Sequence, residues 1–192
     1  IGDDELGKQT LEAVRAAGVD TTYVQINSMP TSRVLVTVNA NGIPQYEIVE
    51  NVAWDDIRYA DNLNGLISDA SAVCWGSLAQ RSLTTRSTIA SILENIPESC
   101  LKVFDINIRQ HYYDREGVED SLLKADILKL NEDELPLVAG LLELNSELSD
   151  VAAVMSELIQ KYSLKYVVYT CGADFSEVYD NTGLVSHIKT PS

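Results

Sequence analysis

The chain has 192 residues, of which 45% are hydrophobic and 22% are charged, and its formal net charge at pH 7 is −15. This composition is typical of a globular protein that can bury a core, and it excludes a disordered chain. An acidic surface repels nucleic-acid backbones and anionic lipid, so we expect no nucleic-acid partner and no membrane partner.

The three cysteines are Cys74, Cys100 and Cys171. Their odd number and wide spacing are typical of reduced thiols and not of a disulfide framework. No apolar run is long enough to cross a membrane. These features together predict a cytoplasmic protein.

The first elements are a helix and a strand-like segment. Asp3 or Asp4 can cap a helix that runs to about Ala17, and Gly18 can close it in the left-handed conformation. Residues 23–26 are strand-like.

A hairpin follows. Residues 33–38 and 45–49 are strand-like and flank Asn39-Ala40-Asn41-Gly42, which has the chemistry of a tight turn. The first strand alternates only partly between apolar and polar residues, which predicts a sheet covered mainly on one face.

Helices and apolar strands alternate along the rest of the chain. Helical patterns occupy residues 55–67, 83–95, 118–125, 136–142 and 150–162, with Ser149 as the N-cap of the last. Short apolar runs occupy residues 72–75, 101–104, 126–130 and 166–169, and a final hairpin joins 175–179 to 184–188. The alternation predicts a Rossmann-like three-layer α/β/α fold with a mostly parallel sheet and a small attached β-hairpin at 31–51.

Ligands of such sheets bind beyond the carboxyl ends of the strands, and polar residues gather there. Asp105, Asn107 and Arg109 follow one apolar run, and in extended backbone their side chains point to the same side. This set suits a polyhydroxylated or phosphorylated ligand. The alternative is a surface loop with a local ion pair.

Asn131 and Glu134 follow the next run with the spacing of a helix capping box. Pro136 disfavours a helix that begins at Asn131, because the ring would then fall in the second turn. We therefore expect a tight turn over 131–134, with Pro136 opening the helix. Asn131 and Glu134 are then free to support Mg²⁺ and its waters.

Thr170 and Gly172 end the last apolar strand, where a hydroxyl and a bare backbone can approach phosphates. A plain strand-end turn uses the same residues. The two histidines lack metal-ligand spacing, and the Gly-x-Ser-x-Gly, Walker A and Gly-x-Gly-x-x-Gly patterns are all absent.

Several short motifs occur in a fixed order: Gly-x-Asp-x-x-Gly at 2–7, Gly-Val-Asp-Thr at 18–21, Gly-Ser-Leu at 76–78, Asp-x-Asn-x-Arg at 105–109, Asn-x-x-Glu at 131–134 and Thr-x-Gly at 170–172. In this order and spacing the chain resembles the ribokinase-like (PfkB) carbohydrate kinases along essentially its whole length. The resemblance implies a kinase body of residues 1–30 and 52–192 and a β-lid of residues 31–51 that closes over a sugar.

The sequence departs from the family pattern at two places. Phe175 stands where the family's Thr-x-Gly-x-x-Gly motif has its last glycine. The family's Gly-Ala-Gly-Asp signature, whose Asp is the catalytic base, is absent and would be expected shortly after Ser192, while the opening strand would precede Ile1. We therefore expect a central piece of a kinase that cannot catalyse as it stands.

The resemblance implies ATP-dependent phosphorylation of a sugar hydroxyl, most like a fructokinase. The alternatives are a 2-keto-3-deoxygluconate kinase, a ribokinase, a non-catalytic sugar-binding protein with this fold, and an oxidoreductase, which the missing glycine fingerprint disfavours. The lid edges predict a homodimer. The implied roles are sugar or phosphoryl contact for Asn107 and Arg109, nucleotide contact for Asn131, Thr170 and Gly172, and support of Mg²⁺ for Glu134.

Overall fold

The computed structural model of the chain describes residues 1–38, 42 and 44–191. The chain forms two compact units. The first comprises Ile1–Ile67 and Ser82–Glu94, and the second comprises Ser68–Arg81 and Asn95–Ser192. In the part of the chain that is described, no helix is both long enough and apolar enough to cross a membrane.

The first unit begins with helix α1 (Glu5–Ala16), as predicted. The Asp4 carboxylate accepts the backbone N–H of Gly7 at 2.7 Å, which satisfies an amide that has no partner inside the helix. Gly18 follows the helix with a φ of 77°, a conformation that glycine adopts without strain.

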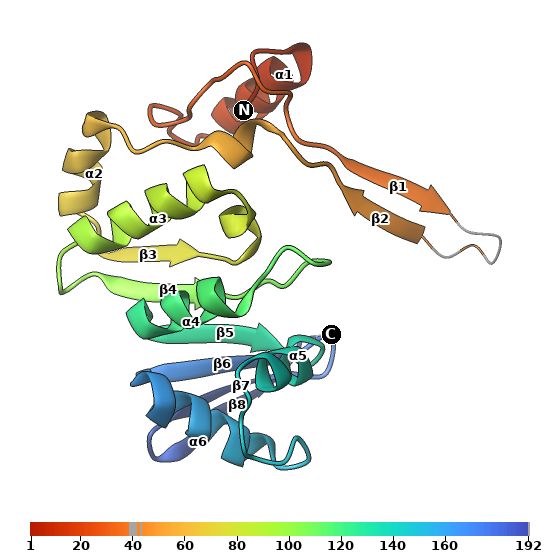
Figure 1. Cartoon of the computed structure of the whole chain (residues 1–192), viewed down its shortest axis with the longest axis vertical. Helices are drawn as coiled ribbons and strands as arrows, with labels where there is room; N and C mark the ends of the chain where they lie inside the picture. Colours follow the sequence, from red (N-terminus) through yellow and green to blue (C-terminus); the bar gives the residue numbers. More distant parts are fainter. Residues whose placement is uncertain (39–41, 43, 192) are drawn as a thin grey trace. The chain divides into compact units, whose positions relative to one another are not determined.

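The predicted hairpin also forms, from β1 (Val34–Val38) and β2 (Pro44–Ile48), which pair antiparallel. The predicted turn at 39–42 falls mainly on residues 39–41, which lie outside the described residues. Every residue of β1 is exposed, so the prediction of a sheet covered mainly on one face is wrong here. Figure 1 shows a two-stranded ribbon that extends away from the helices of its unit.

The predicted strand at 23–26 does not form. One isolated parallel bridge joins Gly2 to Asn27, and the Asp3 N–H donates to the Asn27 carbonyl oxygen at 2.8 Å. The segment that provides this bridge turns into helix α1 at Glu5, so the ladder ends after a single step.

The predicted helix at 55–67 is also wrong, because Ile57 interrupts it with an extended ψ of 123°. The Ile57 N–H donates to the Thr85 hydroxyl at 3.1 Å, and the Ile57 carbonyl accepts from the Thr88 hydroxyl at 2.8 Å. Both threonines lie on α3. Their hydroxyls therefore bond the two backbone groups of Ile57 that a continuous helix would pair internally. The segments observed are the 3₁₀ turns η1 (Ala53–Asp56) and η2 (Asp61–Leu63), followed by α2 (Asn64–Ser68) and, later, α3 (Leu83–Asn95).

The second unit contains a six-stranded mixed sheet in the order β3-β4-β5-β6-β7-β8. The first four strands run parallel to one another, and β7 pairs antiparallel with both β6 and β8. This agrees with the predicted apolar runs and the predicted final hairpin. The strands are β3 (Ala72–Trp75), β4 (Leu101–Asp105), β5 (Ile127–Asn131), β6 (Tyr166–Cys171), β7 (Phe175–Asp180) and β8 (Gly183–Lys189).

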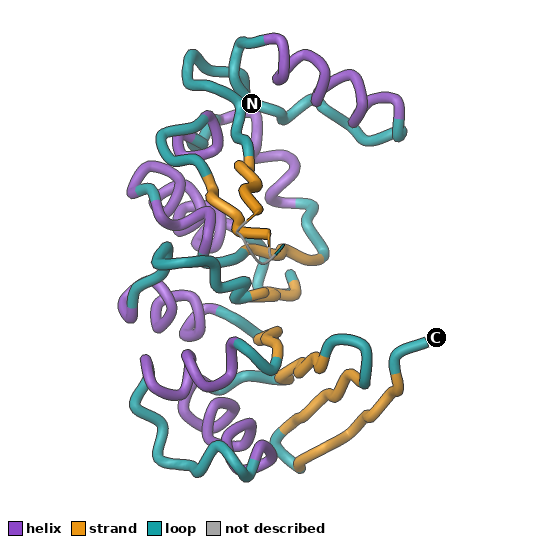
Figure 2. Tube along the Cα trace, turned by 90° about the vertical axis from the view of Figure 1, so that its right-hand side faces the viewer, coloured by secondary structure: helices purple, strands orange, loops and turns teal. Residues whose placement is uncertain are grey.

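This sheet contacts helices α4 (Arg115–Lys124), α5 (Glu134–Leu141) and α6 (Val151–Tyr162). Figure 2 shows them on one face of the strands. Alternate residues of β5 and β6 are buried, as Leu128 and Leu130 are in β5. The N-cap of α6 is Asp150 and not the predicted Ser149, because the Asp150 carboxylate accepts the Ala153 N–H at 3.0 Å.

Candidate functional site

The four parallel strands end at the same edge of the sheet, and backbone hydrogen bonds join the segments that follow them. The Ser77 N–H donates to the Ile106 carbonyl at 3.1 Å, and the Glu132 N–H donates to the Thr170 carbonyl at 3.1 Å. The sequence-predicted site residues lie at the last positions of these strands or shortly after them, so the fold brings them to one edge. They are Asn107, Arg109, Asn131, Glu134, Thr170 and Gly172.

The turn after β3 packs closely against the end of β4. A Cβ atom at Gly76 would lie 2.8 Å from the Asp105 carbonyl oxygen and 3.8 Å from the Asn107 Cβ. Glycine at this position therefore allows the two backbone segments to approach each other, which fixes the start of the 105–109 segment.

The segment at 105–109 is not extended, so the premise that placed its three polar side chains on one side is wrong. β4 ends at Asp105, and Asn107 has a φ of 45°. Arg109 is exposed, and its Nη1 donates to the Ile108 carbonyl oxygen at 2.8 Å. The Asp105 carboxylate lies 3.0 Å from Lys129 Nζ on β5, so the ion pair of this segment is with Lys129. Asn107 and Arg109 remain predictions as ligand contacts.

Asn131 and Glu134 bond to each other's backbone. The Asn131 Oδ1 accepts the N–H groups of Asp133 and Glu134 at 3.0 and 2.9 Å, and Glu134 Oε2 accepts the Asn131 N–H at 2.9 Å. The turn at 132–133 forms as expected, and α5 begins at Glu134, two residues before the expected start. The reciprocal bonding of a capping box is present together with this turn.

The Glu134 side chain is 3% exposed, and its second oxygen is also engaged. Oε1 accepts the backbone N–H of Ile108 at 2.9 Å, a residue 26 positions earlier in the chain. The expectation that the turn leaves this carboxylate free to face a ligand is therefore wrong.

Thr170 lies opposite Asn131 in the parallel register of β5 and β6. Gly172 is exposed with a φ of 44°, and a Cβ there would lie 3.3 Å from Glu132 Oε1. Cys171 lies between these two residues. Burial raises the pKa of its thiol, so the thiol stays protonated and is a poor nucleophile. Burial likewise raises the pKa of the neighbouring Tyr169 hydroxyl to about 12.

The side chains of this edge do not fit a Mg²⁺ site by themselves. Among the described residues, no group of three or more His, Cys, Asp and Glu side chains could hold a metal ion. Both Glu134 oxygens accept backbone N–H groups, and so does Asn131 Oδ1. A Mg²⁺ ion needs several oxygen ligands, and these would have to come from elsewhere, such as nucleotide phosphates.

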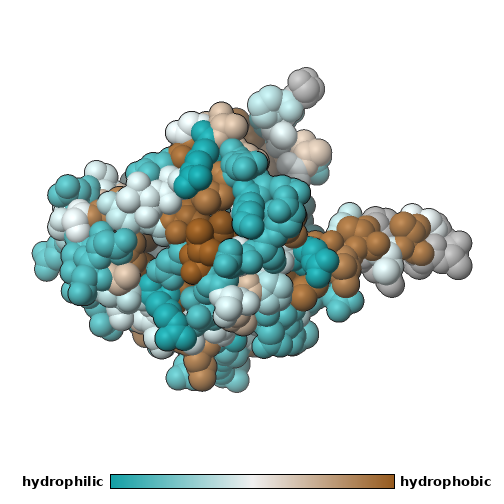
Figure 3. Space-filling view, turned by 90° about the horizontal axis from the view of Figure 1, so that it is seen from above, coloured by the Kyte–Doolittle hydropathy of each residue, from teal (hydrophilic) through white to brown (hydrophobic). Residues whose placement is uncertain are grey.

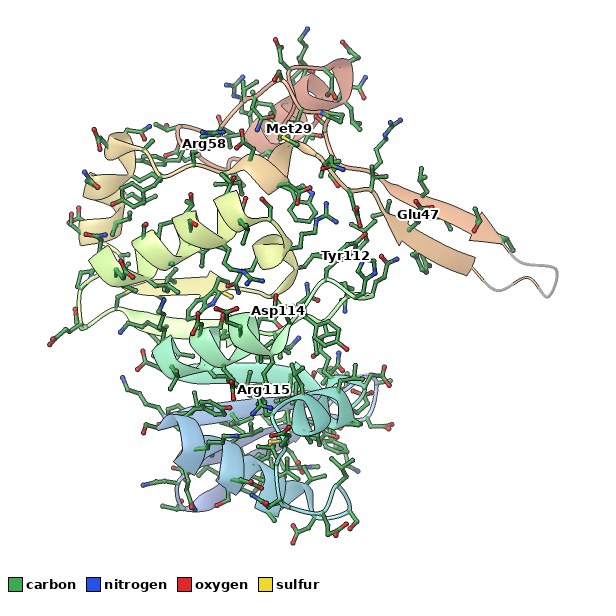
Figure 4. The ribbon with its side chains drawn as sticks, viewed as in Figure 1. Met29, Glu47, Arg58, Tyr112, Asp114 and Arg115 are labelled. Carbon is green, nitrogen blue, oxygen red and sulfur yellow. The ribbon has the colours of Figure 1, made fainter. Side chains whose placement is uncertain are left out.

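Besides the bond between Ile108 and Glu134, sequence reasoning missed two side-chain contacts at this edge. The first is Lys129, the ion-pair partner of Asp105. The second is Arg81, whose guanidinium lies 4.7 Å from the centre of the Tyr112 ring. Figure 4 labels Tyr112 in the loop between β4 and α4. The period-two pattern of β5 could have placed Lys129 on the face opposite Leu128 and Leu130, but no spacing signal links Arg81 to Tyr112.

Comparisons with known proteins agree with the arrangement. The model of the pfkB family carbohydrate kinases matches residues 1–192. Two curated relatives are 27% identical: an ATP-dependent 6-phosphofructokinase of Thermoanaerobacterium thermosaccharolyticum and a fructokinase of Klebsiella pneumoniae. Each match covers 73% of this chain but only 45% and 48% of the respective relatives.

A solved structure shares the fold. The crystal structure of a fructokinase from Xylella fastidiosa matches with a TM-score of 0.81 at 20% identity, over 100% of this chain and 61% of that one. The same fructokinase with bound ATP gives a TM-score of 0.80 at 20% identity, over 100% of this chain and 60% of that one. The chain therefore spans about half of the curated relatives and about three fifths of this structure.

Proposed function

The chain belongs to the pfkB family of carbohydrate kinases, and on this premise we propose that the protein transfers the γ-phosphoryl group of ATP to a sugar hydroxyl. The observation that carries the proposal is the shared edge of β3–β6. There the residues of the Asp-x-Asn-x-Arg, Asn-x-x-Glu and Thr-x-Gly motifs are linked by hydrogen bonds within one unit. A phosphoryl transfer needs two ligands held in line, and the segments to which we assign the sugar and the nucleotide both lie at this edge.

The proposed roles follow the chemistry of each side chain. Arg109 is exposed and carries a permanent charge, so it suits a contact to the sugar or to the transferring phosphoryl group. Asn107 lies two residues before it and offers an amide to sugar hydroxyls. Thr170 and Gly172 present a hydroxyl and an exposed backbone to the nucleotide, and Asn131 supports the same side of the site.

Mg²⁺ is part of this proposal as the partner of the ATP phosphates, where it would neutralise phosphate charge. The chain's own contribution is to bind and orient the two substrates. The proton of the attacked hydroxyl needs a base. We propose that this base is the Asp of the family's Gly-Ala-Gly-Asp signature, which residues 1–192 do not contain. On this proposal the chain as it stands is inactive.

We propose fructose as the substrate, with 2-keto-3-deoxygluconate and ribose as the competing candidates. A coupled assay of ADP release with MgATP and each sugar, and with nucleosides, tests this in the complete protein. We expect the highest kcat/KM with fructose. Calorimetric binding of fructose without ADP release would favour a non-catalytic sugar-binding protein, and binding of neither ligand would reject the proposal.

We propose that the hairpin is both a lid over the sugar and a dimer contact. We also propose that the protein is cytoplasmic. In an antiparallel ribbon, directly opposed residues share a face. Val34 pairs with Ile48 and Val36 with Tyr46, so one face of the ribbon is apolar. Val36 is 55% exposed and Tyr46 is 61% exposed. Figure 3 shows hydrophobic atoms along the ribbon, and we propose that a second copy of the chain covers them.

A further inference from the structure

The Glu134 carboxylate joins the loop after β4 to the end of β5. Its Oε1 accepts the N–H of Ile108 and its Oε2 accepts the N–H of Asn131, each at 2.9 Å. Ile108 lies between Asn107 and Arg109 in the loop after β4, whereas Asn131 ends β5. One side chain therefore holds both the proposed sugar segment and the proposed nucleotide segment by their backbones.

The Glu134 carboxylate is buried and has no access to solvent that would suit a surface role. Glu134 is 3% exposed and is the first residue of α5, where the helix dipole favours a negative charge. Among the described residues, no lysine, arginine or histidine forms an ion pair with it. Its charge is balanced by backbone N–H groups, which are strong donors to a carboxylate.

The loop that Glu134 holds has an unusual backbone. Asn107 has a φ of 45°, which non-glycine residues seldom adopt unless the surroundings impose it. The loop is fastened on both sides of this residue. Before it, the Ile106 carbonyl accepts the Ser77 N–H at 3.1 Å, and after it, the Ile108 N–H donates to Glu134.

We propose that Glu134 is a positioning residue that couples the sugar loop to the nucleotide loop, and that it is not a ligand of Mg²⁺ or of its waters. The inference rests on the proposed function for the identity of the two loops. Its structural part, the double backbone contact, is independent of any activity. Loss of Glu134 should release Asn107 and Arg109 on one side and Asn131 on the other.

The test compares Glu134→Gln with the parent protein by amide hydrogen exchange, followed by NMR. Glutamine keeps one acceptor oxygen and replaces the other with a donor, so it cannot accept both N–H groups. We expect the exchange of the Ile108 or the Asn131 amide to rise about tenfold or more, as for the loss of a bond to a charged acceptor. Glu134→Asp keeps the charge but is one methylene shorter, and it should fail to reach one of the two amides.

Asp126→Asn is the matched control. Asp126 precedes β5 at the opposite end of the same strand, where its carboxylate accepts the Lys102 N–H at 2.8 Å and lies 3.0 Å from Lys165 Nζ. This variant should lower stability and leave the Ile108 and Asn131 amides as protected as before, apart from the change in global unfolding. A loop-specific change in Glu134→Gln then separates positioning from general stability.

Kinetics in the complete protein give a second measurement. For Glu134→Gln we expect KM to rise for both fructose and MgATP, while the midpoint of the Mg²⁺ titration at saturating ATP stays unchanged. Unchanged exchange at both amides, or a Mg²⁺ midpoint that shifts while both KM values stay constant, would overturn the proposal. If the parent protein turns over no sugar, the proposed function fails, and the exchange data still decide the role of Glu134.

Discussion

Gly76 lies against the carbonyl oxygen of Asp105, so closely that an alanine Cβ would be 2.8 Å from that oxygen. The neighbour is backbone and cannot swing away. We expect Gly76→Ala to reduce the free energy of unfolding by about 1–3 kcal/mol, the usual range for overpacking. We also expect weaker sugar binding, because the displaced segment leads to Asn107.

Gly140→Ala is the matched control for this substitution. Gly140 lies in α5, and a Cβ there would meet nothing within 4 Å. An alanine should stabilise the helix by about 0.5–1 kcal/mol. Urea unfolding of the two variants measures both values, and a Gly76→Ala protein as stable as Gly140→Ala would contradict the steric argument.

Arg109→Ala should lower kcat/KM for the sugar at least about tenfold, because a charge-assisted hydrogen bond to a ligand is lost. Steady-state kinetics measure this. Arg58→Ala serves as the control: Arg58 pairs with Asp56 at 2.9 Å, and its side chain is 72% exposed. Figure 4 labels Arg58 on the first unit. Equal kcat/KM values for the two variants would show that Arg109 is a surface residue that does not contact the ligand.

Acid should weaken the first unit through Asp4. Hydrogen bonds from the Thr31 backbone and hydroxyl and from the Gly7 N–H lower the pKa of Asp4 from 3.8 to about 2. A carboxyl whose pKa is lowered by folding stabilises the protein above its unfolded pKa and loses this contribution as the pH falls to the folded pKa.

We therefore expect the stability difference between the parent and Asp4→Asn to be constant above pH 4 and to shrink between about pH 4 and pH 2. Thermal unfolding of both proteins over this range measures it. Other carboxylates with a lowered pKa, such as Glu157 at about 2, change both proteins equally and cancel in the comparison. A difference that does not depend on pH would be inconsistent with the Asp4 contacts.

The dimer proposal predicts that the two faces of the ribbon respond differently to charge. Val36→Asp places a carboxylate on the apolar face beside Tyr46 and should shift the protein from dimer to monomer. Thr37→Asp adds the same charge on the opposite face, which carries Leu35 and Glu47, and should leave the dimer intact. Light scattering at micromolar concentration measures the mass. A parent protein that is already monomeric there would reject the proposal.

Much of the fold could be predicted because its signals are local. The cap at Asp4, the glycine at Gly18 and the alternation of Leu128 and Leu130 depend on neighbours only a few residues away. The parallel strands with polar residues after them then placed the candidate site at one edge of the sheet. The family motifs supplied the proposed roles, which geometry alone does not assign.

The rest was decided by contacts between distant segments. Ile57 leaves a helical pattern because Thr85 and Thr88, 28 and 31 residues later, bond to its backbone. Asn107 departs from the extended conformation because both of its neighbours are held by distant residues. Ser77 bonds to Ile106, and Glu134 bonds to Ile108.

The sequence by itself determined which residues reach the edge of the sheet, because strand period and helix capping are fixed by short spacings along the chain. Only the tertiary structure decided what those residues do there. The two oxygens of Glu134 could have faced solvent or a ligand, and their direction depends on where the Ile108 amide lies, 26 residues away. A buried carboxylate must be satisfied by whichever donors the fold brings to it, and spacing along the chain does not reveal them.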